Sequence, residues 1–306
     1  MTPVLAHVVR SGFVESAHRG AVVVLDATGR VVAAAGDADA PVFPRSSNKP
    51  LQAVGMLRAG LDLPPDDLAI ACASHWGEPM HLDRVRSILA RAGVGESALR
   101  CPPDLPLHDT ARADLLRAGG TATPIHMNCS GKHAAMLATC ALHGWPADDY
   151  RHPGHPLQRA ITATFADLTG APPPAIGVDG CGAPVLATSL TSLARAFQHL
   201  VDAPDGPSRR VADAMRAHPT LTSGTGTDDA WLMAAVPGLL SKGGAEGVWA
   251  FAVPGTGAVA FKIEDGAMRP RRVIAAAALR RLGIEVDGTT VVLGGGHPVG
   301  EVVPAW

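Results

Sequence analysis

The hydrophobic positions of the chain follow two periods in turn. Near the amino end, the apolar runs 21–25 and 30–36 flank a four-residue turn that ends in Gly29, which predicts a β-hairpin. Between about residues 80 and 235, apolar residues recur at helical spacing and Gly and Pro separate the segments. This spacing predicts helices over 82–92, 110–118, 132–143, 157–169, 189–201, 208–217 and 229–235. Strands return at 247–253, 257–263 and 290–293, with a helix over 273–282 between the last two.

Strands, then helices, then strands is the order expected of an α+β fold in which both chain ends build one antiparallel sheet around an inserted helical lobe. We expect a single domain over 1–306, with a sheet lobe at about 1–45 and 240–306 and a helical lobe at about 46–239. No internal repeat is visible. The nearest thing to a linker, the proline run at 171–174, lies inside the helical region.

The amino-acid composition argues against several classes of function. The chain has 306 residues, 47% of them hydrophobic and 18% charged, which is enough to bury a large core. A net charge of -2 and 4% aromatic residues, with Tyr150 the single tyrosine, argue against nucleic-acid binding. Neither a signal sequence nor a membrane-spanning run is visible, and five cysteines are an odd number for a disulfide framework. We therefore expect a cytoplasmic protein that does not bind membranes, with reduced thiols.

The first candidate for chemistry is the pair Ser46 and Lys49, at the start of a segment with helical spacing that ends in Gly60. A lysine three residues beyond a serine on one helical face can take the hydroxyl proton if the amine is neutral. Burial and the positive end of a helix both favour the neutral amine. The alternative is that the serines only cap the helix.

Three further stretches carry reactive side chains. The turn 73–81 contains Ser74, two histidines and Glu78, although Ser74 could also be a capping residue. The stretch 126–133 lacks the glycine and the Ser/Thr of a phosphate loop, but it contains Cys129 and Lys132, and a second thiol, Cys181, lies on the glycine-rich loop 178–182. Two distant cysteines are a weak zinc signal, and buried inert thiols are the alternative.

The last stretch is 255–260, which has the letters of a dinucleotide fingerprint. A Rossmann loop must open a helix, whereas this one continues as a strand, so we predict a hairpin turn. The strand carries Lys262 between two apolar residues. A half-buried lysine there needs a partner, and the alternative is a lysine that points to solvent.

Taken together, the motifs resemble the asparaginase II family, the rhizobial-type or class 3 L-asparaginases, whose fold is similar to that of serine β-lactamases and glutaminases. The resemblance covers most of the chain. It is carried, in order, by the segments 44–52, 74–81, 127–133, 177–184, 224–226, 243–247 and 262–266.

The resemblance implies a set of site residues and partners. Two serine–lysine pairs, Ser46 with Lys49 and Ser74 with Lys262, would be catalytic. The expected substrate-binding residues are Arg45, His75, Glu78, Asn128 and Gly244. A zinc ion would be held by Cys129, Lys132 and Cys181, with Asp179 close by and water completing the shell. The implied substrate is L-asparagine and the implied assembly is a homodimer. Trp76 adds bulk to the second motif, which puts the pocket size in doubt.

The hypothesis that follows is an amidohydrolase that converts L-asparagine to L-aspartate and ammonia through an acyl-enzyme. Ser46 would attack the amide carbon and neutral Lys49 would take its proton, while Ser74 and Lys262 would pass a proton to leaving ammonia or tune Lys49. The alternatives are a glutaminase or another β-lactamase-like serine amidase, a metallohydrolase in which zinc activates the water, and a non-catalytic metal- or ligand-binding domain. The first hypothesis requires both serine–lysine pairs to meet in one pocket.

Overall fold

The computed structural model describes residues 2–306 and divides them into two compact units. The sheet unit contains the chain up to Ser47, Thr188–Asp202 and Ala235–Trp306. The helical unit contains Asn48–Ala187 and Ala203–Ala234. The sheet unit therefore includes the helix at 190–202, which the sequence-based division assigns to the helical lobe.

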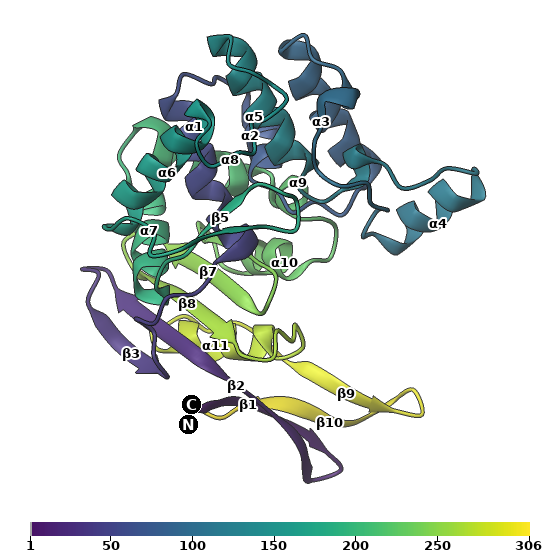
Figure 1. Cartoon of the computed structure of the whole chain (residues 1–306). Coiled ribbons are helices and arrows are strands. Elements are labelled where there is room, and N and C mark those ends of the chain that lie inside the picture. Colours follow the sequence, from purple (N-terminus) through teal and green to yellow (C-terminus); the bar gives the residue numbers. More distant parts are fainter. Residues whose placement is uncertain (1) are drawn as a thin grey trace. The chain divides into compact units, whose positions relative to one another are not determined.

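One antiparallel sheet of eight strands dominates the sheet unit (Figure 1), in the order β6-β7-β8-β2-β1-β10-β9, with β3 also paired to β2. Its strands are β1 (Val4–Arg10), β2 (Phe13–Asp26), β3 (Val31–Ala35), β6 (Leu240–Gly243), β7 (Val248–Val253), β8 (Gly257–Ile263), β9 (Thr290–Gly294) and β10 (His297–Pro304). The amino-terminal strands β2 and β1 lie between two groups of strands from the carboxy-terminal part of the chain. The expected α+β architecture, with an antiparallel sheet built from both ends, is confirmed.

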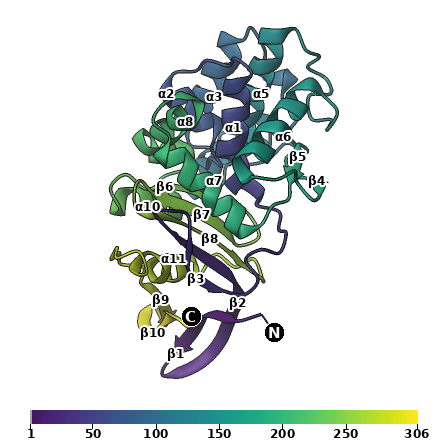
Figure 2. The same ribbon diagram turned by 90° about the vertical axis from the view of Figure 1, so that its left-hand side faces the viewer.

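The centre of the sheet is buried on both faces. Every residue of β7 is buried, and only Lys262 in β8 is half-buried. Trp249, Phe251 and Phe261 pack edge to face, with ring centroids 5.6 to 6.5 Å apart. Helix α7 (Leu190–Asp202) lies along β2, β7 and β8 (Figure 2), and α11 (Arg271–Arg280) packs against β1 and β10. The turn between β7 and β8 is the expected hairpin.

The helical unit is built around α1. Its helices are α1 (Lys49–Arg58), α2 (Pro65–Ala71), α3 (Pro79–Arg91), α4 (Asp109–Arg117), α5 (Ser130–His143), α6 (Pro156–Thr169), α8 (Gly206–Ala217), α9 (Pro219–Thr222) and α10 (Asp228–Ala235), whose last residue belongs to the sheet unit. A two-stranded hairpin, β4 (Ile176–Val178) and β5 (Pro184–Leu186), and two 3-10 helices, Glu96–Ala98 and Pro124–His126, complete it. Nine of the ten α1 residues are buried, because α2, α5, α6 and α8 all pack on it.

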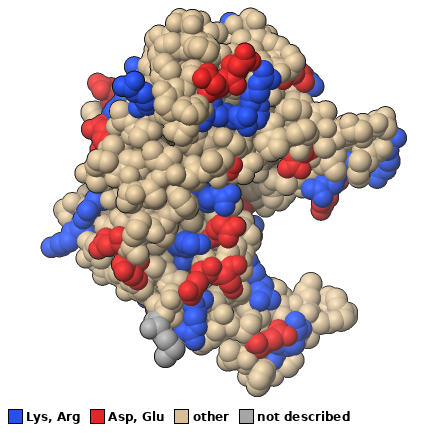
Figure 3. All heavy atoms as spheres, in the orientation of Figure 1, with Lys and Arg blue, Asp and Glu red and all other residues tan. Residues whose placement is uncertain are grey.

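The predicted helices and strands all occur with small shifts at their ends, except that the strand predicted at 21–25 begins eight residues earlier, at Phe13. The pattern missed β1, β6 and β10, the short helices α2 and α9, and the β4–β5 hairpin. No helix among residues 2–306 combines the length and apolar character needed to cross a bilayer. Positive and negative side chains are interspersed on the face drawn in Figure 3, in keeping with the small net charge.

Candidate active site

The buried amine of Lys49 is the central feature of the helical unit. Lys49 is the first residue of α1 and is only 1% exposed. Its Nζ donates to the carbonyl of Ala73 at 2.5 Å and to the hydroxyl of Ser74 at 3.0 Å. Among residues 2–306 no carboxylate forms an ion pair with it. An amine held by neutral oxygens away from water is well placed to exchange a proton with a hydroxyl.

The loop that carries Ser74 runs from the end of α2 to the start of α3. The Ser74 N–H donates to the carbonyl of Thr222 at 3.1 Å, and the His75 N–H donates to the carbonyl of Asn128 at 3.1 Å. Neighbouring segments on both sides therefore fix this loop by its backbone, which places the Ser74 hydroxyl against Lys49.

The ring of His75, from the same loop, is fully buried. Its Nδ1 accepts from the Gly77 N–H at 3.2 Å, so its proton is on Nε2, which donates to the Ser130 hydroxyl at 2.8 Å. Burial is the main reason that the pKa of His75 lies well below its ordinary value, and the neighbouring His81 and Lys49 side chains act in the same direction. The substrate-binding role of His75 stays a prediction, since both ring nitrogens already have protein partners.

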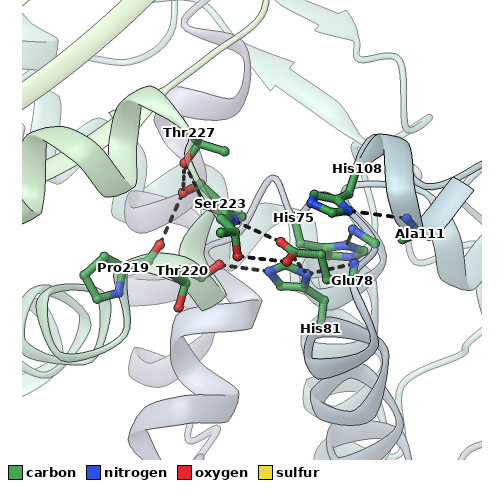
Figure 4. Close-up of polar contacts among 12 residues, drawn as sticks. His75, Glu78, His81, His108, Ala111, Pro219, Thr220, Ser223 and Thr227 are labelled. Atoms are coloured by element: carbon green, nitrogen blue, oxygen red, sulfur yellow. Dashed lines mark hydrogen bonds and ion pairs between the residues drawn. The ribbon is translucent and has the colours of Figure 1, made fainter.

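Glu78 and His81 connect the same loop to α9 and the turn after it (Figure 4). The Nδ1 of His81 accepts from the Glu78 N–H at 3.1 Å, and its Nε2 donates to the Thr220 carbonyl at 2.9 Å. The Glu78 carboxylate accepts from the Thr225 N–H at 2.9 Å and from its hydroxyl at 2.8 Å. Burial raises the pKa of Glu78, but the two bonds from Thr225 outweigh that effect and leave the pKa below its ordinary value.

A second buried cluster joins the start of α5 to the β4–β5 turn. The Nζ of Lys132 donates to the sulfur of Cys181 at 3.1 Å, and the Cys129 thiol donates to the Asn128 side chain at 3.0 Å. The neighbouring Cys129 thiol and the Lys132 ammonium lower the pKa of Cys181, while burial acts in the opposite direction. The cluster therefore favours a thiolate at Cys181.

The donor set of this cluster can be compared with the needs of zinc. Two sulfurs and one amine converge, which leaves the fourth position of a tetrahedral site open. No group of three or more His, Cys, Asp or Glu side chains suitable for a metal occurs within residues 2–306, so Lys132 would have to supply the third ligand. Because a coordinating lysine must be neutral, metal binding would have to displace its proton. With that condition, the three residues fit a zinc ion.

In the sheet unit, Ser46 lies in the 3-10 helix Arg45–Asn48, which runs directly into α1. Arg45 has a positive φ of 51° and is 3.8 Å from the carboxylate of Glu246, itself at a φ of 58°. Non-glycine residues in this region of φ are strained and cluster at functional sites. A Cβ on Gly244 would lie 2.5 Å from the Pro44 carbonyl, so only glycine lets the β6–β7 turn approach this helix so closely.

Lys262 is half-buried and does not point freely into solvent. Its Nζ donates to the carbonyls of Glu246 at 2.7 Å and Ile263 at 3.4 Å. Burial lowers the pKa of Lys262 below its ordinary value, with Glu246 opposing and Arg45 reinforcing the change. The partner that the sequence required for this lysine is thus a pair of backbone carbonyls.

Sequence reasoning missed two buried cations in the same unit. Arg271 bonds to the carbonyls of Gly244 and, at 2.8 Å, Val248, and its guanidinium lies 5.7 Å from the Trp249 ring centroid. Lys242 is 1% exposed in β6. A signal was present, because only four of the 26 basic residues are lysines: Lys49, Lys132 and Lys262 lie in the motifs, and Lys242 directly precedes the motif 243–247.

Comparison with known proteins decides the family. The sequence model described as L-asparaginase II matches residues 6–300, nearly the whole chain. This chain belongs to the L-asparaginase II family. Among curated protein sequences no significant match is found.

The solved structures that match this L-asparaginase II family member are distant from it. Mglu in its native form is 16% identical with a TM-score of 0.46, and the match covers 86% of this chain but 60% of Mglu. A β-lactamase from Mycobacterium bovis is 16% identical with a TM-score of 0.49, covering 87% of this chain and 95% of the other. EstCE1, a hydrolase with promiscuous acyltransferase activity, is 12% identical with a TM-score of 0.46, covering 85% and 93%. The chain thus spans about three fifths of the length of Mglu.

The site residues expected from the L-asparaginase II resemblance fall into two groups. In the helical unit, Lys49 and Ser74 meet through a hydrogen bond, and Cys129, Lys132 and Cys181 form the thiol cluster. The helical unit also contains His75, Glu78 and Asn128, and the sheet unit contains Arg45, Ser46, Gly244 and Lys262. The hydrogen bond joins Lys49 to Ser74, whereas the resemblance pairs Lys49 with Ser46 and Ser74 with Lys262.

Proposed function

We propose that this chain is an amidohydrolase that converts L-asparagine to L-aspartate and ammonia through serine–lysine chemistry. The family is one of amidohydrolases by its description. The observation that carries the proposal is Lys49, a buried amine without a carboxylate partner among residues 2–306 that donates to the Ser74 hydroxyl. Burying an amine without a carboxylate partner lowers the stability of the folded state, and such an amine can accept a proton during catalysis.

In the proposed reaction, the hydroxyl oxygen of Ser46 forms a bond to the side-chain amide carbon of asparagine, and its proton passes to neutral Lys49. The tetrahedral intermediate collapses as the C–N bond breaks, and the departing nitrogen takes up the proton held by Lys49 and leaves as ammonia, so that Lys49 is neutral again. Water then attacks the ester, releases aspartate and returns the proton to Ser46. The Ser74 hydroxyl, which is bonded to Lys49, would relay the proton, and Lys262 would tune the amines by its charge.

We also propose a zinc ion held by Cys129, Lys132 and Cys181. When bound, it would supply a positive charge that helps to position the substrate carboxylate. A homodimer and a cytoplasmic location complete the proposal. Both follow from the family resemblance and from the character of the sequence, and sizing by light scattering and cell fractionation would test them.

The decisive experiment measures ammonia release from L-asparagine and L-glutamine by wild type, Ser46→Ala and Ser74→Ala. We expect asparagine to be preferred and each variant to lose about 10³-fold or more in kcat. Mass mapping of a quenched reaction should find the aspartyl adduct on Ser46. Ser97→Ala, at an exposed serine, is the matched control and should behave as wild type.

Each contrary outcome points to a different conclusion. An adduct on Ser74 would reverse the assignment of the nucleophile, and preference for glutamine would make the enzyme a glutaminase. Full activity in Ser46→Ala and Ser74→Ala would overturn serine chemistry altogether. A rate that chelation abolishes outright would favour a metallohydrolase.

A further inference from the structure

The segment from α9 to the start of α10 forms three contacts with the Ser74 loop and the start of α3, and Figure 4 shows the one between His81 and Thr220. The Thr222 carbonyl accepts the Ser74 N–H, and the Thr220 carbonyl accepts the His81 ring proton. In the third contact, Thr225 donates twice to the carboxylate of Glu78. All three contacts lie within the helical unit.

The third contact differs from the other two because it holds an exposed turn. Thr225 is solvent-exposed and lies between Gly224 at a φ of 148° and Gly226 at a φ of 77°. At the tip, Thr225 and Gly226 are both exposed, so little buried surface orders these two residues. The bonds to a charged acceptor are shorter and stronger than neutral ones, so Glu78 is the principal restraint on the tip of this turn.

The turn is internally stiff, which lets a restraint at Thr225 reach Thr222. The Ser223 hydroxyl donates to the Thr227 hydroxyl at 2.6 Å (Figure 4), and its oxygen also lies 3.2 Å from the Pro219 carbonyl. The Thr227 hydroxyl donates to the Gly224 carbonyl at 3.0 Å. Movement of the tip would therefore shift the Thr222 carbonyl on which the Ser74 backbone depends.

On its other side, the Ser74 loop is already fixed. The backbone of His75 bonds to Asn128, and the ring of His75 bonds to Ser130. With one side of the loop rigid, the position of the Ser74 hydroxyl relative to Lys49 depends on the α9 side. That side is anchored by Glu78.

We propose that Glu78 is a positioning residue, whose carboxylate holds Thr225 and, through the turn 222–227, keeps the Ser74 hydroxyl in place for Lys49. This inference rests on the proposed function, in which Ser74 relays the proton. It replaces direct binding of substrate by Glu78, because both carboxylate oxygens already accept hydrogen bonds from Thr225.

The test is a double-mutant cycle of Glu78→Gln and Thr225→Val, with Thr225→Ser as the matched control. Valine keeps the size and the backbone N–H of threonine but lacks the hydroxyl, and serine restores it. Three quantities are measured: kcat and KM for ammonia release, the melting temperature, and hydrogen exchange of the peptide containing the Ser74 amide. The exchange measurement needs no turnover.

We expect Thr225→Val to lower kcat about tenfold with KM within about twofold, since a bond to a carboxylate is lost at a site that does not touch substrate. Glu78→Gln should do the same, and the double variant should lose no more than the larger single loss. Exchange of the Ser74 peptide should accelerate in all three, while the melting temperature stays within about 2 °C of wild type because the Thr225 side chain is exposed. Thr225→Ser should restore kcat and exchange.

Two results would overturn the inference. In one, Glu78→Gln raises KM while Thr225→Val leaves kcat and exchange unchanged, which would mean that Glu78 contacts substrate directly. In the other, exchange accelerates but kcat does not fall, so the held turn does not position Ser74. If wild type releases ammonia from neither substrate, the proposed function fails, and unchanged exchange in Thr225→Val would separately refute the contact pathway.

Discussion

At the scale of the residue, the lysines of this chain have different surroundings from most of its arginines. Many arginines form surface ion pairs, such as Arg58 with Asp167 at 2.7 Å and Arg84 with Asp66 at 2.6 Å, although Arg271 is buried. Lys49 instead lies buried against a carbonyl and a hydroxyl, and Lys262 against two carbonyls. Since lysine, unlike arginine, can lose its proton when it is desolvated, the lysines are the residues suited to proton transfer.

The first prediction concerns the buried amine itself. Lys49→Met should lower kcat/KM for asparagine about 10³-fold, because the proton acceptor is removed. Its free energy of unfolding should stay within about 1 kcal/mol of wild type, since the lost hydrogen bonds offset the relief from burying an amine. Ammonia assays and urea denaturation measure the two quantities.

The matched control for that change is Arg58→Met, which removes an exposed cation from the last turn of the same helix. It should leave both quantities near the wild-type values. An active Lys49→Met enzyme would remove Lys49 from the mechanism. A variant that fails to fold would instead make Lys49 a structural residue.

At the scale of the element, the turn between β6 and β7 packs against the 3-10 helix that carries Ser46. The Gly244 backbone lies so close to Pro44 and Ser47 that no side chain fits there. The Arg271 side chain, from α11, donates hydrogen bonds to the carbonyls of Gly244 and Val248. Three elements of the sheet unit thus determine the backbone around Ser46.

Adding one methyl group at this contact should therefore be costly. Gly244→Ala should lower the free energy of unfolding by about 1–3 kcal/mol, the usual cost of overpacking, and should lower kcat by displacing Ser46. Thermal melting and ammonia assays would measure both effects. The control is Gly95→Ala, whose new Cβ would meet nothing nearer than the Ser97 hydroxyl at 3.7 Å. If Gly244→Ala is as stable as wild type, the β6–β7 turn can shift to accommodate the added methyl group, and the prediction is wrong.

At the scale of the molecule, each unit is organised around a different framework. The sheet unit has a wide antiparallel sheet with an aromatic core, and the helical unit has α1 at its centre. The β4–β5 hairpin has only two strands of three residues, which is marginal by itself. Its main polar link to α5 is the Cys181 cluster, so a metal there would tie the hairpin to the helices.

Zinc should accordingly behave as part of the fold of the helical unit. Purified wild type should contain about one zinc per chain, and removal with dipicolinate should lower the melting temperature by several degrees, because a ligand that binds only the folded state stabilises it. Cys181→Ser should lose the metal, whereas Cys140→Ser, at a buried thiol of α5, should keep it. Metal content by mass spectrometry and thermal melting give the readouts. Equal zinc in wild type and Cys181→Ser would place the metal elsewhere.

Only part of the candidate site could be predicted from the sequence. Spacing and residue type singled out Ser46, Lys49, Ser74 and Lys262, because hydroxyls and amines near apolar runs are recognisable in one dimension. The bond between Lys49 and Ser74 joins residues 25 positions apart, and helical spacing cannot predict it. The sequence likewise did not predict that His75 and His81 are buried, since polar residues in a turn are normally exposed to solvent.

By itself the sequence determined the α+β class, most helices and strands, and the order of the motifs, because periodicity and turn residues act over a few positions. Tertiary structure alone decided which strands pair, that α7 packs on the sheet, and which partners the lysines receive. It also decided that Glu78 holds Thr225, 147 residues further along the chain. Contacts of this kind depend on where whole elements come to rest, and no local pattern encodes that position.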